Sequence, residues 1–299
     1  MKTYLGVSRL PFLLLTPACV VLGLGTAYWE TGHVHWLYFV LALLGALAAH
    51  ISVNALNEYY DFRSGLDSRT QRTPFSGGSG TLPANPAEAR KALLWGLFTL
   101  AVTAAIGLYF LIVRGWALLP LGLLGVVLVY AYTLWITRLP LVSLIAPGLG
   151  FGTLMVLGTD YVLTGGYHWA AFWASLTPFF LVNDLLLLNQ FPDVEADRSV
   201  GRRNYPIVLG RPAAAKIYVL FLALAYLSPL VAVALGFLPG WSLLGLLTLV
   251  LAVPTAQKAL RHADDLPHLM PALGNNVLVN LLTPVLMALG LWLAGSGLF

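Results

Sequence analysis

Nine runs of mostly apolar residues, each about 20 residues long, constrain the fold of this chain more than any other feature. A helix needs roughly that length to cross the hydrocarbon core of a bilayer. Only 9% of the 299 residues are charged, whereas a soluble domain carries about 25%, so lipid must solvate much of the surface. We therefore expect an all-α, polytopic membrane protein with a single domain over residues 1–299. The expected spans are 11–29, 36–58, 92–113, 116–136, 141–163, 168–191, 213–237, 241–258 and 274–297.

The positions of the basic residues predict the orientation of these spans. Cytoplasmic loops of membrane proteins carry an excess of Lys and Arg. With a cytoplasmic N-terminus, 15 of the 16 basic residues fall on the cytoplasmic side and only Arg114 falls outside. We expect an integral, multi-pass protein, in the inner membrane if the source is bacterial, with its N-terminus and active site toward the cytoplasm. The same bias explains the net charge of +4, so no nucleic-acid partner is expected.

Two clusters of Asn and Asp stand at the cytoplasmic ends of the second and sixth expected spans. Each contains the pattern Asn-x-x-x-Asp, and the two copies are 132 residues apart. Residues four apart lie on one face of a helix, so we expect each pattern to present its side chains together. The clusters are Asn57, Asp61 and Asp67, and Asn189, Asp193 and Asp197.

Carboxylates at membrane depth are costly unless they are compensated. Mg²⁺ prefers oxygen ligands and is often held by carboxylates together with substrate phosphates. A single Asp beside an Arg at a helix end is usually an interfacial pair, but two clusters beside basic loops favour a site. We therefore predict that the two clusters hold Mg²⁺ on a diphosphate, with the four Asp residues catalytic. Flanking arginines, whose planar forks match phosphate oxygens, are expected to bind substrate: Arg69, Arg72, Arg198, Arg202 and Arg203.

Two further residues are candidates for substrate contact. Tyr132 stands near a cytoplasmic helix end, where its ring could shield an allylic cation, although Tyr is common at every membrane interface. Asp184 lies inside the sixth span, and ionisable residues within a membrane often have a function. Two roles for Asp184 are open. It could help to bind the acceptor, or it could stay protonated and form a hydrogen bond to a neighbouring helix.

The paired clusters, together with Gly201-Arg202-Arg203 and Pro206-Ile-Val-Leu-Gly210, resemble the UbiA superfamily of intramembrane prenyltransferases. This resemblance covers the whole chain. It implies nine transmembrane helices around a central cavity that opens to the cytoplasm, with the two Asp-rich motifs on the second and sixth. It also implies Mg²⁺-dependent transfer of a polyprenyl chain from a prenyl diphosphate to an aromatic acceptor, within the lipid bilayer.

The five-residue gap from Asp61 to Asp67, and the segment Gly158–Gly165, resemble the menaquinone-pathway branch, whose acceptor is 1,4-dihydroxy-2-naphthoate. Asp160 and Asn204-Tyr205-Pro206 depart from the pattern of that branch. Other acceptors therefore stay open, including 4-hydroxybenzoate, homogentisate and a lipid alcohol. A membrane transporter is the alternative from a different class, although carriers usually place their acids near the bilayer midplane and not at one end.

Overall fold

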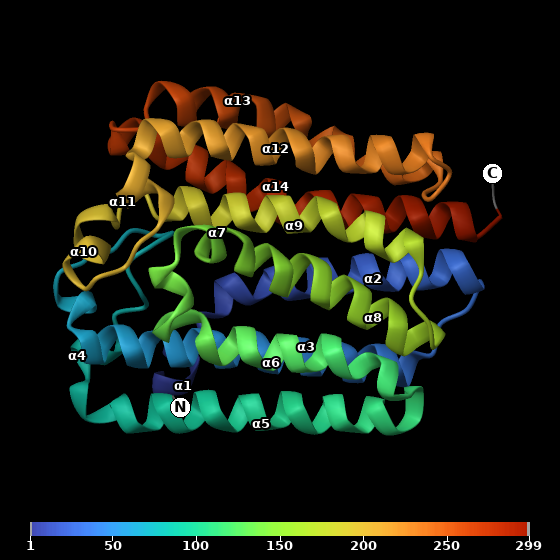
Figure 1. Ribbon diagram of the computed structural model, residues 1–299, viewed down its shortest axis with the longest axis horizontal. Helices are drawn as coiled ribbons and strands as arrows, with labels where there is room; N and C mark the ends of the chain where they lie inside the picture. The colour runs from blue at the N-terminus through green and yellow to red at the C-terminus, as the bar shows by residue number, and fades with distance from the viewer. Residues whose placement is uncertain (1, 298–299) are drawn as a thin grey trace.

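A computed structural model describes residues 2–297 of the protein. Within this range, nine helical segments are long and apolar enough to cross a membrane. They run side by side along the long axis of the molecule (Figure 1). The predicted all-α bundle of membrane-spanning helices is thereby confirmed. The spans are Leu10–Thr31, Trp36–Ser64, Pro86–Arg114, Trp116–Leu134, Pro140–Thr164, Trp169–Asn189, Arg211–Ala234, Gly240–Arg261 and Leu266–Gly295.

The α-helices are more numerous than the spans, because one span contains two of them and several connections contain a short helix. Short 3₁₀ turns extend some ends, such as Leu66–Ser68 after α3 and Gly240–Thr248 before α13. The α-helices are α1 (Lys2–Ser8), α2 (Leu15–Thr31), α3 (Trp36–Ser64), α4 (Thr81–Ala84), α5 (Ala89–Arg114), α6 (Leu119–Leu134), α7 (Pro140–Gly148), α8 (Met155–Thr164), α9 (Trp169–Asn189), α10 (Val194–Ser199), α11 (Tyr205–Leu209), α12 (Arg211–Ala234), α13 (Leu249–Arg261) and α14 (Leu266–Gly295).

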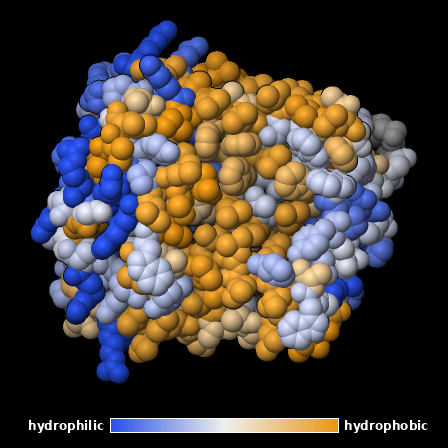
Figure 2. All heavy atoms as spheres, viewed as in Figure 1, coloured by the Kyte–Doolittle hydropathy of each residue, from blue (hydrophilic) through white to orange (hydrophobic). Residues whose placement is uncertain are grey.

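Hydrophilic side chains gather at one end of the bundle, which we call the motif end because α3 and α9 both terminate there. Figure 2 shows these side chains on the left and a wide apolar band across the middle. Helices satisfy their backbone hydrogen bonds internally, so such a band can face lipid without unpaired polar groups. The protein is therefore an integral, multi-pass membrane protein.

Helix α9 lies at the centre of the bundle. In its most apolar window 67% of the residues are buried, against 11% for the span that contains α6. Its neighbours are α12 and α14, which share with it an apolar cluster that includes Leu181, Leu188, Tyr218, Leu222 and Leu273. This packing fixes the position of the polar residues that follow α9.

The fifth span lies very close to α9 at two glycines. A Cβ atom at Gly148 or Gly152 would overlap the backbone of Phe179, so a larger residue would force the helices apart. The Gly148 N–H also donates to Asn183 Oδ1 at 2.6 Å. Between α7 and α8 the chain forms a π-helical segment, Leu149–Leu154, a feature that often occurs at functional sites. One side of the cavity described below is thus held against the centre of the bundle.

Several expected helix ends differ from the structure. The second span ends at Ser64 and not at residue 58, and the third begins at Pro86 and not at residue 92. The last span begins at Leu266 and not at residue 274, because Asp265 caps the helix through its side chain before the strongly apolar stretch begins. The second cluster also does not lie on one continuous helical face. Helix α9 ends at Asn189 and a turn precedes α10, because Pro192 lacks a backbone N–H and disfavours helical geometry in the residue before it.

Candidate active site

A cavity of about 520 Å³ begins at the motif end and extends deep into the bundle. Its lining on α3 extends from Ala42 to Asp61, which corresponds to about 28 Å of helix at 1.5 Å per residue. At the motif end the walls carry most of the charged groups, while further in they are largely apolar and come from α3, α5, α6 and α8. Tyr132 of α6 belongs to the lining, as does His50 of α3.

The first Asp cluster lies at the C-terminal end of α3. Asn57 and Asp61 stand one turn apart on this helix and both line the cavity, as the sequence predicts. Helix α3 then ends at Gly65, whose backbone has φ +75°, a conformation that favours glycine. The following 3₁₀ turn brings Asp67 back to the cavity wall. The spacing of Asp61 and Asp67 is therefore explained by this turn.

The second cluster reaches the same cavity in spite of the break after α9. Asn189 is the last residue of α9, Asp193 immediately precedes α10 and Asp197 lies within α10. All three line the cavity, and the Asp197 N–H donates to the Asp193 carbonyl at 2.8 Å. The turn thus replaces the continuous helix but keeps the three side chains together.

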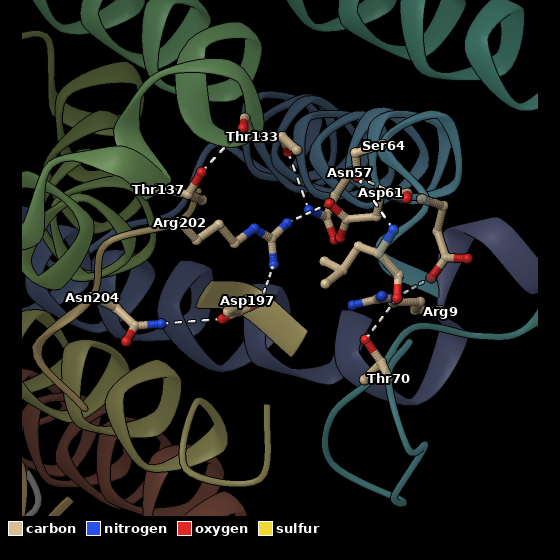
Figure 3. A network of polar contacts seen from close by, with 12 residues as sticks. Arg9, Asn57, Asp61, Ser64, Thr70, Thr133, Thr137, Asp197, Arg202 and Asn204 are labelled. Atoms are coloured by element: carbon tan, nitrogen blue, oxygen red, sulfur yellow. Dashed lines mark hydrogen bonds and ion pairs between the residues drawn. The ribbon is translucent and has the colours of Figure 1, made fainter. Parts of the chain in front are cut away.

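The guanidinium of Arg202 joins the two clusters. It forms an ion pair with Asp61 of α3 and donates through Nη1 to Asp197 Oδ1 at 2.9 Å. Asn204 Nδ2 donates to the other oxygen of Asp197 at 3.1 Å. Figure 3 shows the Arg202 side chain between Asp61 and Asp197. Residues from distant parts of the chain therefore form one polar site.

Negative charge exceeds the positive charge that the site itself provides. Burial raises the pKa of Asp67 to about 7, and the neighbouring carboxylates of Asp61 and Glu58 add to this effect. Burial and the adjacent Asp197 likewise raise the pKa of Asp193 to about 7. Arg202 opposes the shift in both cases but does not remove it. A further cation would therefore be bound favourably here.

Unpaired oxygen atoms point to the kind of cation. Among the residues that the structure describes, Asp67 Oδ2, Asn189 Oδ1 and Asp193 Oδ1 are buried acceptors without a hydrogen-bond donor. Leaving such acceptors unpaired costs about 1–3 kcal/mol each. Carboxylate and amide oxygens are ligands that Mg²⁺ prefers, so the donor set fits this ion. The residues that could hold it are Asn57, Asp61, Asp67, Asn189, Asp193 and Asp197.

Comparison with known proteins agrees with this geometry. Residues 15–268 match the UbiA prenyltransferase family. The chain belongs to this family. It is 26% identical over 264 residues to the 1,4-dihydroxy-2-naphthoate octaprenyltransferase of Bacillus subtilis, covering 86% of this chain and 82% of the relative. It is 28% identical over 304 residues to the enzyme of the same name from Escherichia coli, covering 98% and 96%. The predicted superfamily and the resemblance to its menaquinone branch are confirmed.

A solved structure shares the fold of this UbiA prenyltransferase. The UbiA homolog from Archaeoglobus fulgidus bound to DMAPP and Mg²⁺ superimposes with a TM-score of 0.61 at 16% identity, covering 99% of this chain and 100% of the homolog. The family match and the two sequence relatives show that the protein is a prenyltransferase enzyme, and the transporter alternative is set aside.

Arg9 is a cavity residue of this UbiA prenyltransferase that sequence reasoning missed. Its Nε donates at 2.6 Å to Glu58 Oε1, and Glu58 is almost fully buried. The same carboxylate accepts from the backbone and the hydroxyl of Ser79, both at 2.7 Å. Glu58 thus holds in place the Gly-rich loop Ser76–Gly80, of which Gly77 and Gly78 line the cavity. In the sequence, Arg9 had only indicated membrane orientation, and no local pattern distinguished it from the other basic residues.

Four arginines that were predicted to bind substrate lie outside the cavity lining. All four are exposed. Arg69 donates to Ser199 Oγ at 3.1 Å, and Arg198 pairs with Glu195 at 3.1 Å. Water solvates such side chains, so their positions do not support direct substrate binding. The four are Arg69, Arg72, Arg198 and Arg203.

Asp184, also predicted to contact substrate, is fully buried behind the cavity wall and is not part of the lining. Neither of its carboxylate oxygens has a hydrogen-bond partner among the described residues. Its backbone contacts a polar pair on α12 and α14: Tyr218 OH donates to Asn276 Oδ1 at 3.1 Å, and Asn276 Nδ2 donates to the Asp184 carbonyl at 3.4 Å. Its position therefore does not support contact with a substrate in the cavity.

Proposed function

We propose that this prenyltransferase moves a polyprenyl chain from its diphosphate to 1,4-dihydroxy-2-naphthoate, with Mg²⁺ as cofactor, in menaquinone biosynthesis. One observation carries the proposal: three unpaired buried oxygens, on Asp67, Asn189 and Asp193, stand at the polar end of a long apolar cavity. This combination suits an amphipathic donor with a charged head and a hydrocarbon tail. The names of the relatives and the Mg²⁺ of the Archaeoglobus homolog support the finer assignment.

The two ends of the cavity would bind the two ends of the donor. The diphosphate would lie among the Asp clusters, where Arg202 and Arg9 line the wall and supply positive charge. The polyprenyl tail would extend along the apolar walls, where burying hydrocarbon stabilises the complex by about 25 cal/mol per Å². Walls from α3 and α6 supply much of this apolar surface.

In the reaction, the C1–O bond of the donor breaks and its electron pair leaves with the diphosphate, while an electron-rich ring carbon of the acceptor bonds to C1. The carboxylate of the naphthoate then leaves as CO₂, and the electron pair of its bond to the ring restores the aromatic system. Mg²⁺ held by the Asp clusters would neutralise the charge on the diphosphate and so make it a better leaving group. Arg202, fixed between Asp61 and Asp197, is positioned to stabilise the charge that develops. The apolar walls exclude water from the allylic carbon, and the ring of Tyr132 can shield its positive charge.

We also propose that the motif end faces the cytoplasm, in the inner membrane if the source is bacterial. The support is the distribution of basic residues, of which 15 of 16 fall on that side of the predicted topology. In this orientation the water-soluble acceptor would reach the polar end of the cavity directly from the cytoplasm.

The experiment is a product screen with purified protein in detergent micelles. The protein is incubated with Mg²⁺, a series of prenyl diphosphates and three acceptors, namely 1,4-dihydroxy-2-naphthoate, 4-hydroxybenzoate and homogentisate. Mass spectrometry then identifies the products. We expect a prenylated, decarboxylated naphthoquinol as the main product. Product formed only with 4-hydroxybenzoate or only with homogentisate would overturn the assignment of the acceptor.

A pair of variants tests the site in the same assay. Asp193→Asn removes one charge from the second cluster and should lower the rate about 10²–10³-fold. Glu195→Gln is the matched control, because Glu195 lies in the same segment but its side chain is 75% exposed and pairs only with Arg198 on the surface. Equal rates for the two variants would contradict the assignment of the Asp cluster as the metal site.

A further inference from the structure

A second group of metal-ligating side chains lies outside the cavity, at the connection between α13 and α14. It contains two imidazoles and one carboxylate, from His262, Asp265 and His268. Each residue offers one ligand atom, and the three atoms lie within 4.8 Å of one another. None of these residues lines the cavity of the candidate active site, so the group is distinct from the two Asp clusters.

Backbone hydrogen bonds hold the three residues in this arrangement. The His262 N–H donates to the Lys258 carbonyl at 2.9 Å, and the Asp265 N–H donates to the His262 carbonyl at 3.0 Å. Asp265 precedes the first turn of α14, where its Oδ1 accepts from the His268 N–H at 3.5 Å. His262, Asp265 and His268 are three positions apart in the sequence, and the turn brings their side chains to one side.

The side-chain contacts go beyond what capping of α14 requires. Capping uses Asp265 Oδ1, whereas Oδ2 lies 2.6 Å from His268 Nδ1 and 3.9 Å from His262 Nδ1. The two imidazole rings are stacked with their centroids 5.3 Å apart and their planes 25° from parallel. Two imidazoles therefore lie beside one carboxylate oxygen. The 2.6 Å contact is a hydrogen bond, which a tetrahedral ion between the three groups would replace, because the ligand atoms of such an ion lie further apart.

The ligand types select the metal. Imidazole nitrogen suits Zn²⁺, Ni²⁺ and Cu²⁺, whereas Mg²⁺ prefers oxygen ligands. The side chains are accessible to a solvated ion, since their exposed fractions are 36% for His262, 48% for Asp265 and 71% for His268. Water could complete the coordination sphere, because a zinc site with three protein ligands commonly keeps an open position.

We propose that His262, Asp265 and His268 form a peripheral binding site for Zn²⁺, separate from the Mg²⁺ of the prenyl-transfer reaction. Binding would join the end of α13 to the first turn of α14. The adjacent residue Asp264 lies 3.9 Å from Arg211, and Arg211 Nε donates to the Phe191 carbonyl at 2.8 Å. Phe191 is two residues from Asp193, so an occupied zinc site would also steady the support of the second Asp cluster.

The test measures zinc binding and thermal unfolding, neither of which requires catalysis. Protein whose affinity tag has been removed is treated with EDTA, dialysed and titrated with ZnCl₂ by isothermal calorimetry, and the same titration is repeated in excess Mg²⁺. In excess Mg²⁺, which would occupy the Asp clusters, we expect one Zn²⁺ per chain and a higher unfolding temperature with Zn²⁺. Without Mg²⁺, the Asp clusters can bind additional Zn²⁺. Absence of zinc binding, or its loss in Mg²⁺, would overturn the proposal.

Substitutions locate the bound ion. His268→Ala and His262→Gln should each weaken zinc binding about tenfold or more, while His33→Ala, which removes an exposed histidine on the connection between α2 and α3, should leave it unchanged. Asp193→Asn should also leave it unchanged. If Asp193→Asn removes zinc binding and His268→Ala does not, the ion occupies the Asp clusters and the proposed site is wrong.

Discussion

The two ends of the bundle both contain a buried acid beside a positively chargeable group, yet they differ in how the acid is paired. At the end opposite the motif end, Asp160 accepts from Thr26 Oγ1 at 2.8 Å and its other oxygen lies 2.8 Å from His168 Nδ1. At the motif end, Asp67 and Asp193 each keep a buried oxygen without a partner. The oxygens of Asp160 are thus paired within the protein, whereas Asp67 and Asp193 at the motif end each keep an oxygen that a ligand could pair with.

The arginines at the two ends differ in the same way. Arg114 donates to the carbonyls of Val162 and Leu163 at 2.7 and 3.0 Å, and its guanidinium lies 4.6 Å from the ring centroid of Tyr38. It therefore connects helices. Arg202 instead faces a cavity and pairs with two acids that belong to the candidate metal site. Charge at a helix end is thus no guide to function by itself, whereas unsatisfied hydrogen-bonding capacity beside a cavity is.

The largest expected effect comes from Asp61→Asn. The substitution removes a carboxylate that faces the cavity and pairs with Arg202, so prenyl transfer should fall about 10²–10³-fold. The rate of product formation at saturating Mg²⁺ checks this. A rate within tenfold of the unchanged protein would mean that the motif end is no more functional than the opposite end.

Arg202→Gln should have the next largest effect. It leaves Asp61 and Asp197 close together without their shared cation, and breaking a buried ion pair costs about 3–5 kcal/mol. We expect a lower unfolding temperature without Mg²⁺, partial recovery when Mg²⁺ is added, and slower transfer. Arg203→Gln is the matched control, because this neighbouring side chain is exposed. Equal unfolding temperatures for the two variants would contradict the bridging role.

At the opposite end, Asp160→Ala should lower stability without lowering activity. Thr26 and His168 would lose their common acceptor, at a cost of about 1–3 kcal/mol. Thermal unfolding in detergent would measure the loss, and transfer by the folded protein should stay within about twofold. Glu30→Ala serves as the control, since Glu30 is an exposed acid near the C-terminal end of α2, the helix that carries Thr26. If folded Asp160→Ala protein lost transfer activity while Glu30→Ala kept it, the opposite end would also be functional, and the contrast between the two ends would be wrong.

The smallest effect is expected for Asp184→Asn. Asp184 is fully buried and neither of its oxygens has a partner among the described residues. A neutral amide avoids the cost of a buried charge, so the unfolding temperature should stay the same or rise slightly. Transfer should also be unchanged. A marked loss of either would show that Asp184 contacts a group essential to the fold or the reaction.

Much of the fold could be predicted because a bilayer demands long apolar helices. The nine spans follow directly from that demand, whereas the start of α14 at Leu266 does not. Its first two turns contain His268 and two prolines, Pro267 and Pro271, and the cap that begins the helix comes from the side chain of Asp265. A search for apolar length therefore places this end too late in the chain.

The Asp clusters of the site could be predicted, but most of the arginines could not. Asn57 and Asp61 follow helical spacing, so their common direction is a local property. Whether Arg202 or Arg203 faces the cavity depends on the extended segment after α10, where the Arg203 N–H donates to the Thr137 carbonyl at 2.9 Å. That contact joins residues far apart in the sequence, and no local pattern encodes it.

The pairing of Asp61 with Arg202 also has a consequence for biosynthesis. The two residues are 141 positions apart, so a ribosome makes Asp61 long before its partner. Until Arg202 has been made, the Asp61 carboxylate at the end of α3 must be protonated, pair with another cation, or remain in water. The first half of the protein should consequently insert with this helix end hydrated or neutralised, until the segment after α10 supplies Arg202.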